Sequence, residues 1–181
     1  MSELFSIQLQ NRQQQGRDGV WLDLPTTTEQ VQAALRQIGI SSDNPQGLFI
    51  SGYFAEEEKR FAIPYNMVLA SNVDELNFLA SRLETLSTGE RAELNAALQA
   101  PQSELSSIEK ITDFPENVDY YVHLPDVHGP AQLGDYYLNR SGMVDMPEEW
   151  KGGIDTAQFG RYVAQQEQGV FTEYGYLVKS G

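Results

Sequence analysis

The chain has 181 residues, no cysteine, and 26 Asp and Glu against 12 Lys and Arg, for a formal net charge of −14. The lack of cysteine excludes disulfides, thiol nucleophiles and cysteine-based zinc sites, while the negative charge disfavours binding to nucleic acid. The chain has no signal-peptide pattern and no apolar run near the roughly 18 residues that span a bilayer, so we expect a soluble cytoplasmic protein.

Residues 1–70 are predicted to form a small α/β domain. Phe5, Ile7 and Leu9 alternate with polar residues, which is typical of a half-buried strand. A helix is predicted to start at the capping-box spacing of Thr26 and Glu29 and to end at Gly39. Further strands are expected at Val20–Leu24, Leu48–Ile50 and Phe61–Ile63.

Residues 71–110 are predicted to form a small helical domain. The pairs Asn72–Glu75, Ser87–Glu90 and Ser106–Glu109 each have the spacing of a helix start. A helical stripe of apolar residues follows the first pair, at Val73, Leu76, Leu79, Leu83 and Leu86. The second helix is expected to end at Ala100-Pro101. A module of this size buries little apolar surface alone, so it should pack against its neighbours.

Residues 111–181 are predicted to form a second α/β domain. Strands are expected at Val118–His123 and Leu133–Leu138, and a short helix is expected after Pro147. A longer helix is predicted over Phe159–Gln168, where Gly169 ends it, and a closing hairpin is predicted over 170–178. The fold class is therefore α+β, with three small domains at 1–70, 71–110 and 111–181.

Negative charge is spread along the whole chain. About one residue in seven is acidic from Glu3 to Glu173, and the one tight run, Glu56-Glu57-Glu58, precedes Lys59-Arg60. Disordered acidic tails concentrate their charge in blocks instead. The three predicted domains carry net charges of −3, −4 and −7. We therefore expect a folded protein with an acidic surface, which could serve solubility, salt adaptation or the imitation of a polyanion such as DNA.

Sequence signatures of catalysis are missing. The chain contains no glycine-rich phosphate loop, no G-x-S-x-G nucleophile elbow and no Ca²⁺-binding loop. His123 and His128 flank Asp126, and the three could bind a metal or serve a hydrolase, but such a stretch is more often an exposed turn. We therefore expect no catalytic residue, no metal, no cofactor and no enzymatic activity.

The last third contains a series of short motifs: Leu133-Gly134-Asp135-Tyr136-Tyr137, Pro147-Glu148-Glu149, Ile154-Asp155, Phe159-Gly160-Arg161 and Phe171-Thr172-Glu173-Tyr174-Gly175-Tyr176. In order and spacing these motifs resemble the end of a known family, the ArdA-type antirestriction proteins. Upstream, Val20–Pro25 resembles an early strand of that family, and Asp74–Leu79 resembles its central helix. The resemblance therefore touches all three predicted domains.

The resemblance implies a function and an architecture. ArdA-type proteins are carried on conjugative elements, form an elongated dimer of three-domain chains, and imitate B-form DNA in the binding groove of type I restriction-modification enzymes in the bacterial host cell. The carboxylates expected to face such an enzyme are Asp74, Glu75, Glu84, Glu90, Glu93, Asp119, Asp126, Asp135, Asp145, Glu148, Glu149 and Asp155. Candidates for the homodimer interface in the C-terminal domain are Tyr136, Tyr137, Trp150 and Phe159.

Other functions stay open at this point. The main alternative is an acidic protein-interaction module that inhibits or scaffolds a different basic partner. An elongated string of domains with acidic residues along one face would favour DNA mimicry, and a compact globule with one acidic patch would favour the module.

Overall fold

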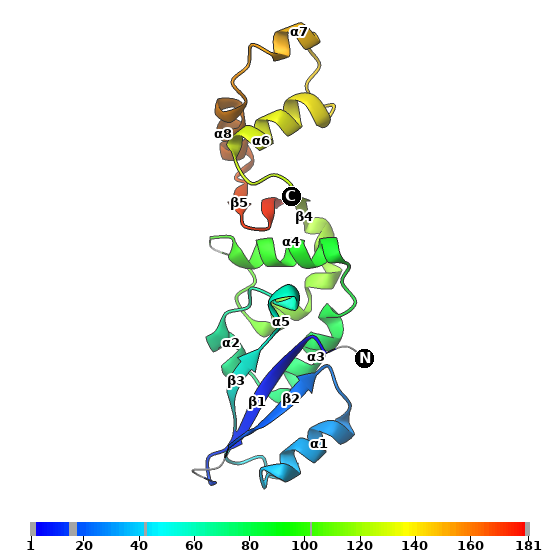
Figure 1. The fold of residues 1–181 in the computed structure, drawn as a ribbon, viewed down its shortest axis with the longest axis vertical. Helices are drawn as coiled ribbons and strands as arrows, with labels where there is room; N and C mark the ends of the chain where they lie inside the picture. The colour runs from blue at the N-terminus through cyan, green and yellow to red at the C-terminus, as the bar shows by residue number, and fades with distance from the viewer. Residues whose placement is uncertain (1–2, 15–17, 42, 102, 180–181) are drawn as a thin grey trace. The chain divides into compact units, whose positions relative to one another are not determined.

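The computed structural model describes residues 3–14, 18–41, 43–101 and 103–179. The fold is mixed α+β, with two small antiparallel sheets and several helices, so the predicted class is confirmed (Figure 1). Contacts divide the chain into two compact units. Unit 1 comprises Met1–Leu86 and Leu105–Pro115, and unit 2 comprises Ser87–Glu104 and Glu116–Gly181. In the described part of the chain, no helix is long and apolar enough to cross a membrane.

Unit 1 is built on a three-stranded antiparallel sheet in the order β2-β1-β3. The strands are β1 (Phe5–Asn11), β2 (Val20–Leu24) and β3 (Leu48–Phe54). They confirm the strands predicted at these three places. Because side chains alternate across a sheet, Ile7 and its partner Leu22 share one face, and both are buried.

Four helices complete unit 1: α1 (Thr28–Gln37), α2 (Tyr65–Leu69), α3 (Val73–Leu83) and α5 (Ile108–Thr112). The predicted apolar stripe of α3 is buried throughout, including Leu86 just beyond its end. Helix α3 packs against α5 and β2, and these contacts help to bury its apolar stripe. The 3₁₀ turn η1 (Glu57–Lys59) follows β3, and a second such turn, η2 (Phe114–Glu116), follows α5.

Four predicted helix starts agree with the structure to within one residue, whereas the helix predicted to start at Phe159 starts three residues earlier, at Thr156. Asn72 caps α3, and the predicted capping box of Ser87 and Glu90 is present at α4 (Thr88–Gln99). Helix α1 is capped by Thr27, one residue later than predicted, because Asn77 holds the backbone of Thr26 through two hydrogen bonds of 2.8 and 3.0 Å. Helix α5 is likewise capped by Ser107, one residue after the predicted Ser106.

The predicted strand at Phe61–Ile63 is wrong. These residues lie outside both sheets, although Phe61 and Ile63 are 2% and 6% exposed. The alternating apolar pattern here reports burial of two side chains against the core of unit 1. Burial of alternate residues does not require that the backbone pair with a strand, and this is why the pattern misled.

Unit 2 contains the second sheet, in the order β4-β6-β5. Its strands are β4 (Tyr121–Leu124), β5 (Val170–Thr172) and β6 (Gly175–Lys179), and the predicted closing hairpin is the β5–β6 pair. The predicted strand at Val118–His123 is only half correct, because the 3₁₀ turn η3 (Val118–Tyr120) precedes β4. Helix α4 packs against β6.

The remaining helices of unit 2 are α6 (Pro130–Asp135), α7 (Glu148–Lys151) and α8 (Thr156–Glu167), with a π-helical turn, η4 (Tyr136–Arg140), after α6. The predicted strand at Leu133–Leu138 is therefore wrong. Its aromatic residues favour strands, but two glycines allow α6 and α8 to touch. A Cβ on Gly134 would lie 1.9 Å from the carbonyl oxygen of Thr156, and one on Gly160 would lie 1.7 Å from that of Pro130.

The core of unit 2 is formed by Val127, Leu133 and Tyr176. Glu167, half-buried near the end of α8, accepts hydrogen bonds from the hydroxyls of Tyr137 and Tyr176 at 2.5 and 2.7 Å. Burial and these bonds raise the pKa of both phenols. Glu167 therefore ties α8 to η4 and to the central strand β6.

The helices of the predicted middle domain are shared between the two units. Helices α3 and α5 belong to unit 1, and α4 belongs to unit 2. The predicted division into three domains, and their elongated arrangement, stay predictions.

Candidate partner-binding surface

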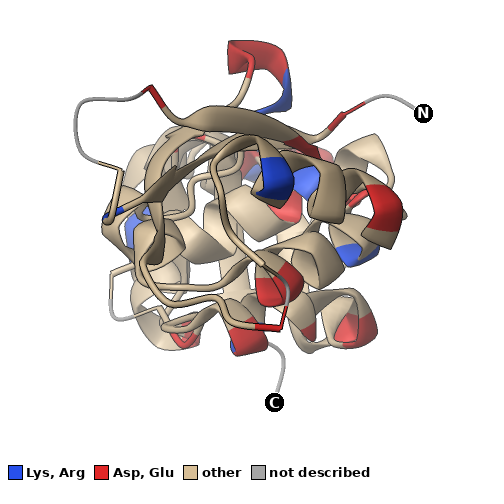
Figure 2. Ribbon diagram, turned by 90° about the horizontal axis from the view of Figure 1, so that it is seen from below, with Lys and Arg blue, Asp and Glu red and all other residues tan. Residues whose placement is uncertain are grey.

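The carboxylates of this protein face solvent. All 26 lie in the described part of the chain: Glu75, Glu90, Glu93 and Glu167 are half-buried and the other 22 are exposed. Red segments in Figure 2 mark Asp and Glu on helices and loops alike. Unit 1 has 13 carboxylates and seven Lys and Arg, a net charge of −6, and unit 2 has 13 and five, a net charge of −8. Both units therefore carry an excess of negative charge.

Three of the predicted partner-binding carboxylates lie on α3 or at its end. Asp74 and Glu84 are exposed, at the first turn and the C-cap. Glu75 is half-buried, and its Oε2 atom accepts a hydrogen bond of 3.4 Å from the side-chain Nδ2 of Asn72. This helix therefore presents acidic side chains at both ends, while its apolar stripe is buried.

Helix α4 holds two further candidates in different environments. The carboxylate of Glu90 accepts a hydrogen bond from the backbone of Ser87 at 2.9 Å, and this bond lowers its pKa. Glu93 lies one turn on, and its Oε2 atom is buried with no hydrogen-bond partner among the described residues. Burial, together with repulsion from Glu90 and Asp119, raises the pKa of Glu93 to about 7. Glu93 is therefore only partly ionised near neutral pH, and Glu90 is fully ionised.

The remaining candidates all belong to unit 2 and are exposed: Asp119, Asp126, Asp135, Asp145, Glu148, Glu149 and Asp155. The contacts that three of them make within the protein bear on the local charge. Asp155 caps α8 through the amides of Ala157 and Gln158, at 3.0 and 3.1 Å. Asp135 accepts a hydrogen bond from Asn139 at 2.8 Å.

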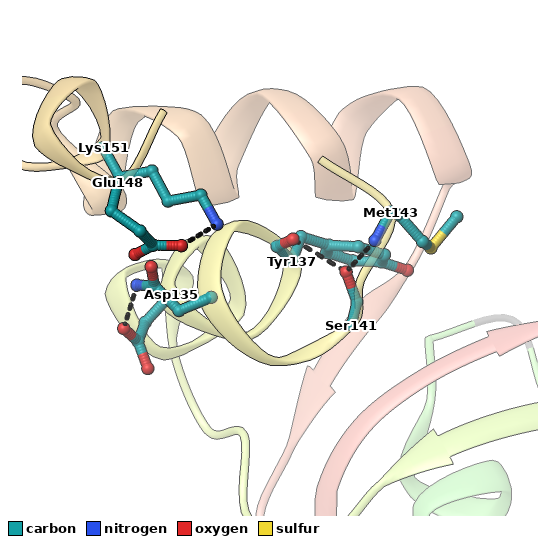
Figure 3. Close-up of polar contacts among 7 residues, drawn as sticks. Asp135, Tyr137, Ser141, Met143, Glu148 and Lys151 are labelled. Carbon is teal, nitrogen blue, oxygen red and sulfur yellow. Dashed lines mark hydrogen bonds and ion pairs between the residues drawn. The ribbon is translucent and has the colours of Figure 1, made fainter. Parts of the chain in front are cut away.

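Glu148 forms the third such contact, an ion pair of 3.0 Å with Lys151 on α7 (Figure 3). Asp135 also lies 3.8 Å from Arg140. Surface ion pairs of this kind are worth about 0.2–1 kcal/mol, so each basic residue offsets part of the local negative charge without removing the carboxylate from solvent. Whether these carboxylates contact a partner stays a prediction.

The segment that links η4 to α7 is anchored at its start. The Ser141 hydroxyl donates to the carbonyl of Tyr137 at 2.7 Å and accepts from the amide of Met143 at 3.1 Å (Figure 3). Beyond this anchor the side chains of Met143 and Trp150 are 74% and 66% exposed. Both side chains therefore leave apolar surface of unit 2 open to solvent.

The four candidates for a dimer interface differ in exposure. Trp150 is exposed, while Tyr136, Tyr137 and Phe159 are half-buried. The rings of Tyr136 and Tyr137 pack edge to face at 5.3 Å, and Tyr137 is bonded to Glu167, so both contribute to the core of unit 2. Dimerisation stays a prediction, and Trp150 has the most surface to offer it.

The histidines show no catalytic arrangement. His123 Nε2 makes a hydrogen bond of 2.7 Å with the carbonyl oxygen of Tyr174, and the side chains of His128 and Asp126 are exposed. Across residues 3–14, 18–41, 43–101 and 103–179, no group of three or more His, Asp or Glu side chains is placed to hold a metal ion. The contact of His123 ties β4 to the β5–β6 turn.

One group of surface residues was missed by the sequence analysis. Trp21 and Phe54 are 49% and 56% exposed on the strands of unit 1, and Glu3 and Asp23 have carboxyl groups close together beside them. The period-two pattern of Val20–Leu24 was a usable signal, because it places Trp21 and Asp23 opposite the buried Leu22 and Leu24.

Comparison with known proteins identifies the family. The family model described as antirestriction protein (ArdA) matches residues 15–178. No curated protein matches the chain. The match spans both units and includes the segments that carried the resemblance. This chain belongs to the ArdA family of antirestriction proteins.

Proposed function

We propose that this antirestriction protein acts as a DNA mimic, which occupies the DNA-binding groove of type I restriction-modification enzymes and keeps DNA out. The observation that carries this proposal is the exposure of 22 of the 26 carboxylates, drawn from both units. A groove that binds DNA presents Lys and Arg side chains to the phosphates. A protein with many exposed carboxylates offers these side chains negative charge of the kind that DNA phosphates supply.

The amount of charge is sufficient for such a role. B-form DNA carries one charge per 1.7 Å of its axis, so 26 carboxylates correspond to roughly 44 Å of duplex. A mimic needs this density only where basic side chains of the enzyme reach it. Two copies in a dimer would double the length.

The binding energy is expected to be shared among many residues. Exposed ion pairs contribute about 0.2–1 kcal/mol each, and salt screens them. Loss of one carboxylate should therefore change inhibition little, whereas loss of many should abolish it. This also explains why the function needs no catalytic residue, cofactor or bound nucleic acid.

We further propose that the protein acts in the cytoplasm of the bacterial host, carried by a mobile genetic element such as a conjugative transposon, and works as a homodimer. Trp150 on α7 supports the dimer proposal, since it is the most exposed of the four aromatic candidates. Sedimentation at several protein concentrations tests it. A mass of one chain at micromolar concentration would contradict the homodimer without touching the proposal of mimicry.

The decisive experiment is a competition titration. A purified type I restriction-modification enzyme is bound to labelled target duplex, and this protein is added at several salt concentrations. We expect stoichiometric displacement of the duplex, which weakens as salt rises because the contacts are ionic. Absence of displacement at micromolar protein would contradict DNA mimicry and favour an acidic module for a different basic partner.

A further inference from the structure

The sheet of unit 1 has an outer face that carries two exposed aromatic side chains. The register pairs Trp21 with Gln8, and Gln8 with Gly52, so these residues share the face opposite the buried one. The next row on the same face joins Asp23, Ser6 and Phe54. Both aromatic side chains are about half exposed. We call this surface, comprising Trp21, Asp23, Phe54 and the adjoining Glu3, the Trp21 face.

Gly52 makes room for the indole. A Cβ at Gly52 would lie 3.0 Å from the outer ring carbon of Trp21, so the ring reaches from β2 across β1 toward β3. The outer edge of the indole therefore reaches the backbone at Gly52, and about half of the side chain is open to solvent. An exposed aromatic ring is a suitable surface for stacking.

Two carboxyl groups meet beside this ring. Glu3 and Asp23 line the same hollow as Trp21, and a hydrogen bond to Asp23, together with repulsion from it, raises the pKa of Glu3. Asp23 in turn accepts a hydrogen bond of 2.6 Å from the hydroxyl of Ser6, which orients it. Lys59 also lies near, but it is 3.8 Å from Glu56, so the local charge stays negative. Paired carboxylates of this kind favour a cation placed between them.

An open hollow of about 700 Å³ adjoins these groups. Its lining includes Trp21, Glu3, Asp23 and Lys59, together with Thr27 and Gln30 at the start of α1. A hollow with an aromatic wall, two carboxylates and polar side chains fits a long side chain with a planar cationic end. Arginine has this form: its guanidinium stacks on indole and bonds carboxylates through two N–H groups at once.

We propose that the Trp21 face binds an arginine-bearing segment of the protein partner, with the guanidinium stacked on Trp21 and bonded to Asp23 and Glu3. The proposal rests on the proposed function, in which the partner is an enzyme whose groove presents basic side chains. Charge complementarity selects this occupant, because unit 1 has a net charge of −6 and a second copy would bring the same charge to the same place.

The proposal changes the expected distribution of binding energy. Exposed carboxylates contribute little one by one, but an aromatic anchor that is covered on binding often dominates an interface. The Trp21 face would then be a focal contact within an otherwise distributed surface.

The first test compares inhibition of a type I enzyme by single variants. We expect Trp21→Ala to need about tenfold more protein for half inhibition, and Asp23→Asn about threefold more. Matched controls are Phe78→Ala and Asp43→Asn, an exposed aromatic and an exposed carboxylate of unit 1 outside the Trp21 face, for which we expect less than about a twofold change. Far-ultraviolet circular dichroism establishes that each variant is folded. Equal inhibition by Trp21→Ala and the wild type would overturn the proposal.

The second test does not need the enzyme. Trp150→Phe leaves Trp21 as the one indole of the chain, so its emission reports on this face. A capped Arg-Gly-Arg peptide should change that emission in low salt, and the Lys-Gly-Lys peptide should change it less, since lysine does not stack. Adding Asp23→Asn should weaken the response to the arginine peptide. No response to this peptide, or an equal response to both, would contradict the proposal.

Together the two tests separate the site from the proposed function. If the wild type fails to inhibit the enzyme but binds the arginine peptide, the Trp21 face stands and DNA mimicry fails. If the wild type inhibits the enzyme, but Trp21→Ala inhibits equally well and the arginine peptide leaves the emission unchanged, DNA mimicry stands and the proposed Trp21 face fails. A lower sedimentation mass of Trp21→Ala would identify a second copy as the occupant and overturn the proposal.

Discussion

Unit 1 and unit 2 contain equal numbers of carboxylates but present them differently. In unit 1 two carboxyl groups meet beside the exposed Trp21 on a sheet face. In unit 2 the exposed carboxylates lie on helix ends and loops. Several of them form an ion pair with a nearby Lys or Arg side chain or cap a helix. The comparison teaches that the same charge can act as a dispersed field or as a focal contact, depending on what surrounds it.

The largest expected effect concerns the dispersed charge of unit 2. We expect simultaneous replacement of Asp126, Asp135, Asp145, Glu148, Glu149 and Asp155 by Lys to weaken inhibition by more than about 100-fold, because six small contributions are lost and six repulsions are added. A competition titration at fixed salt measures this. Replacement of the same six by Asn or Gln is the control and should have a smaller effect. Full inhibition by the reversed variant would show that unit 2 does not face the enzyme.

The next prediction tests whether packing in unit 2 depends on the contact of α6 with α8. Gly134→Ala places a methyl group 1.9 Å from the backbone of Thr156, so we expect a loss of about 3 kcal/mol or more in the free energy of unfolding. Gly89→Ala on α4, where a Cβ meets nothing within 4 Å, is the matched control and should be neutral or stabilising. Urea unfolding followed by circular dichroism measures both. Equal stability of the two variants would contradict the close helix contact.

A smaller effect is expected from Glu93. Its pKa is about 7 in the folded protein against 4.5 for the free side chain, so the folded state holds a proton that the unfolded chain has lost. The free energy of unfolding therefore falls as pH rises from about 4.5 to about 7. Glu93→Gln should remove this dependence and, after allowance for solvent screening, stabilise the protein by about 1 kcal/mol at pH 8, with little change at pH 4.

Urea unfolding of the wild type and Glu93→Gln at pH 4, 6 and 8 measures this difference. Glu90→Gln is the contrasting variant, because the Ser87 bond lowers the pKa of Glu90, and it should lose stability at pH 8. A stability gain in both variants would contradict the distinct environments of the two residues.

The smallest effect is expected from a single exposed carboxylate of unit 2. Glu148→Gln removes one negative charge that is already paired with Lys151, so inhibition should change by less than about twofold. The competition titration compares it directly with Trp21→Ala. If Glu148→Gln alone abolished inhibition while the fold stayed intact, the dispersed description of unit 2 would be wrong.

Several elements could be predicted because their causes are local. The alternation at Phe5, Ile7 and Leu9 sufficed for β1, and the Ser87–Glu90 pair sufficed for the start of α4. The Thr26 cap was misplaced by one residue because Asn77, 51 positions away, bonds its backbone. The Trp21 face also has a local and a non-local part. The excess of carboxylates was evident from the sequence, but the closeness of Glu3 to Asp23 depends on strand register and on the surrounding fold.

The sequence by itself determined the acidity of the chain, most strand and helix positions, and membership of the ArdA family, because charge, periodicity, caps and motifs are read within short segments. Only the tertiary structure decided that Leu133–Leu138 is helical, since that depends on Gly134 meeting Thr156. It also decided that Glu93 is only partly ionised near neutral pH and that the indole of Trp21 reaches Gly52. Burial, repulsion and close contact arise from residues distant in sequence, which no local pattern contains.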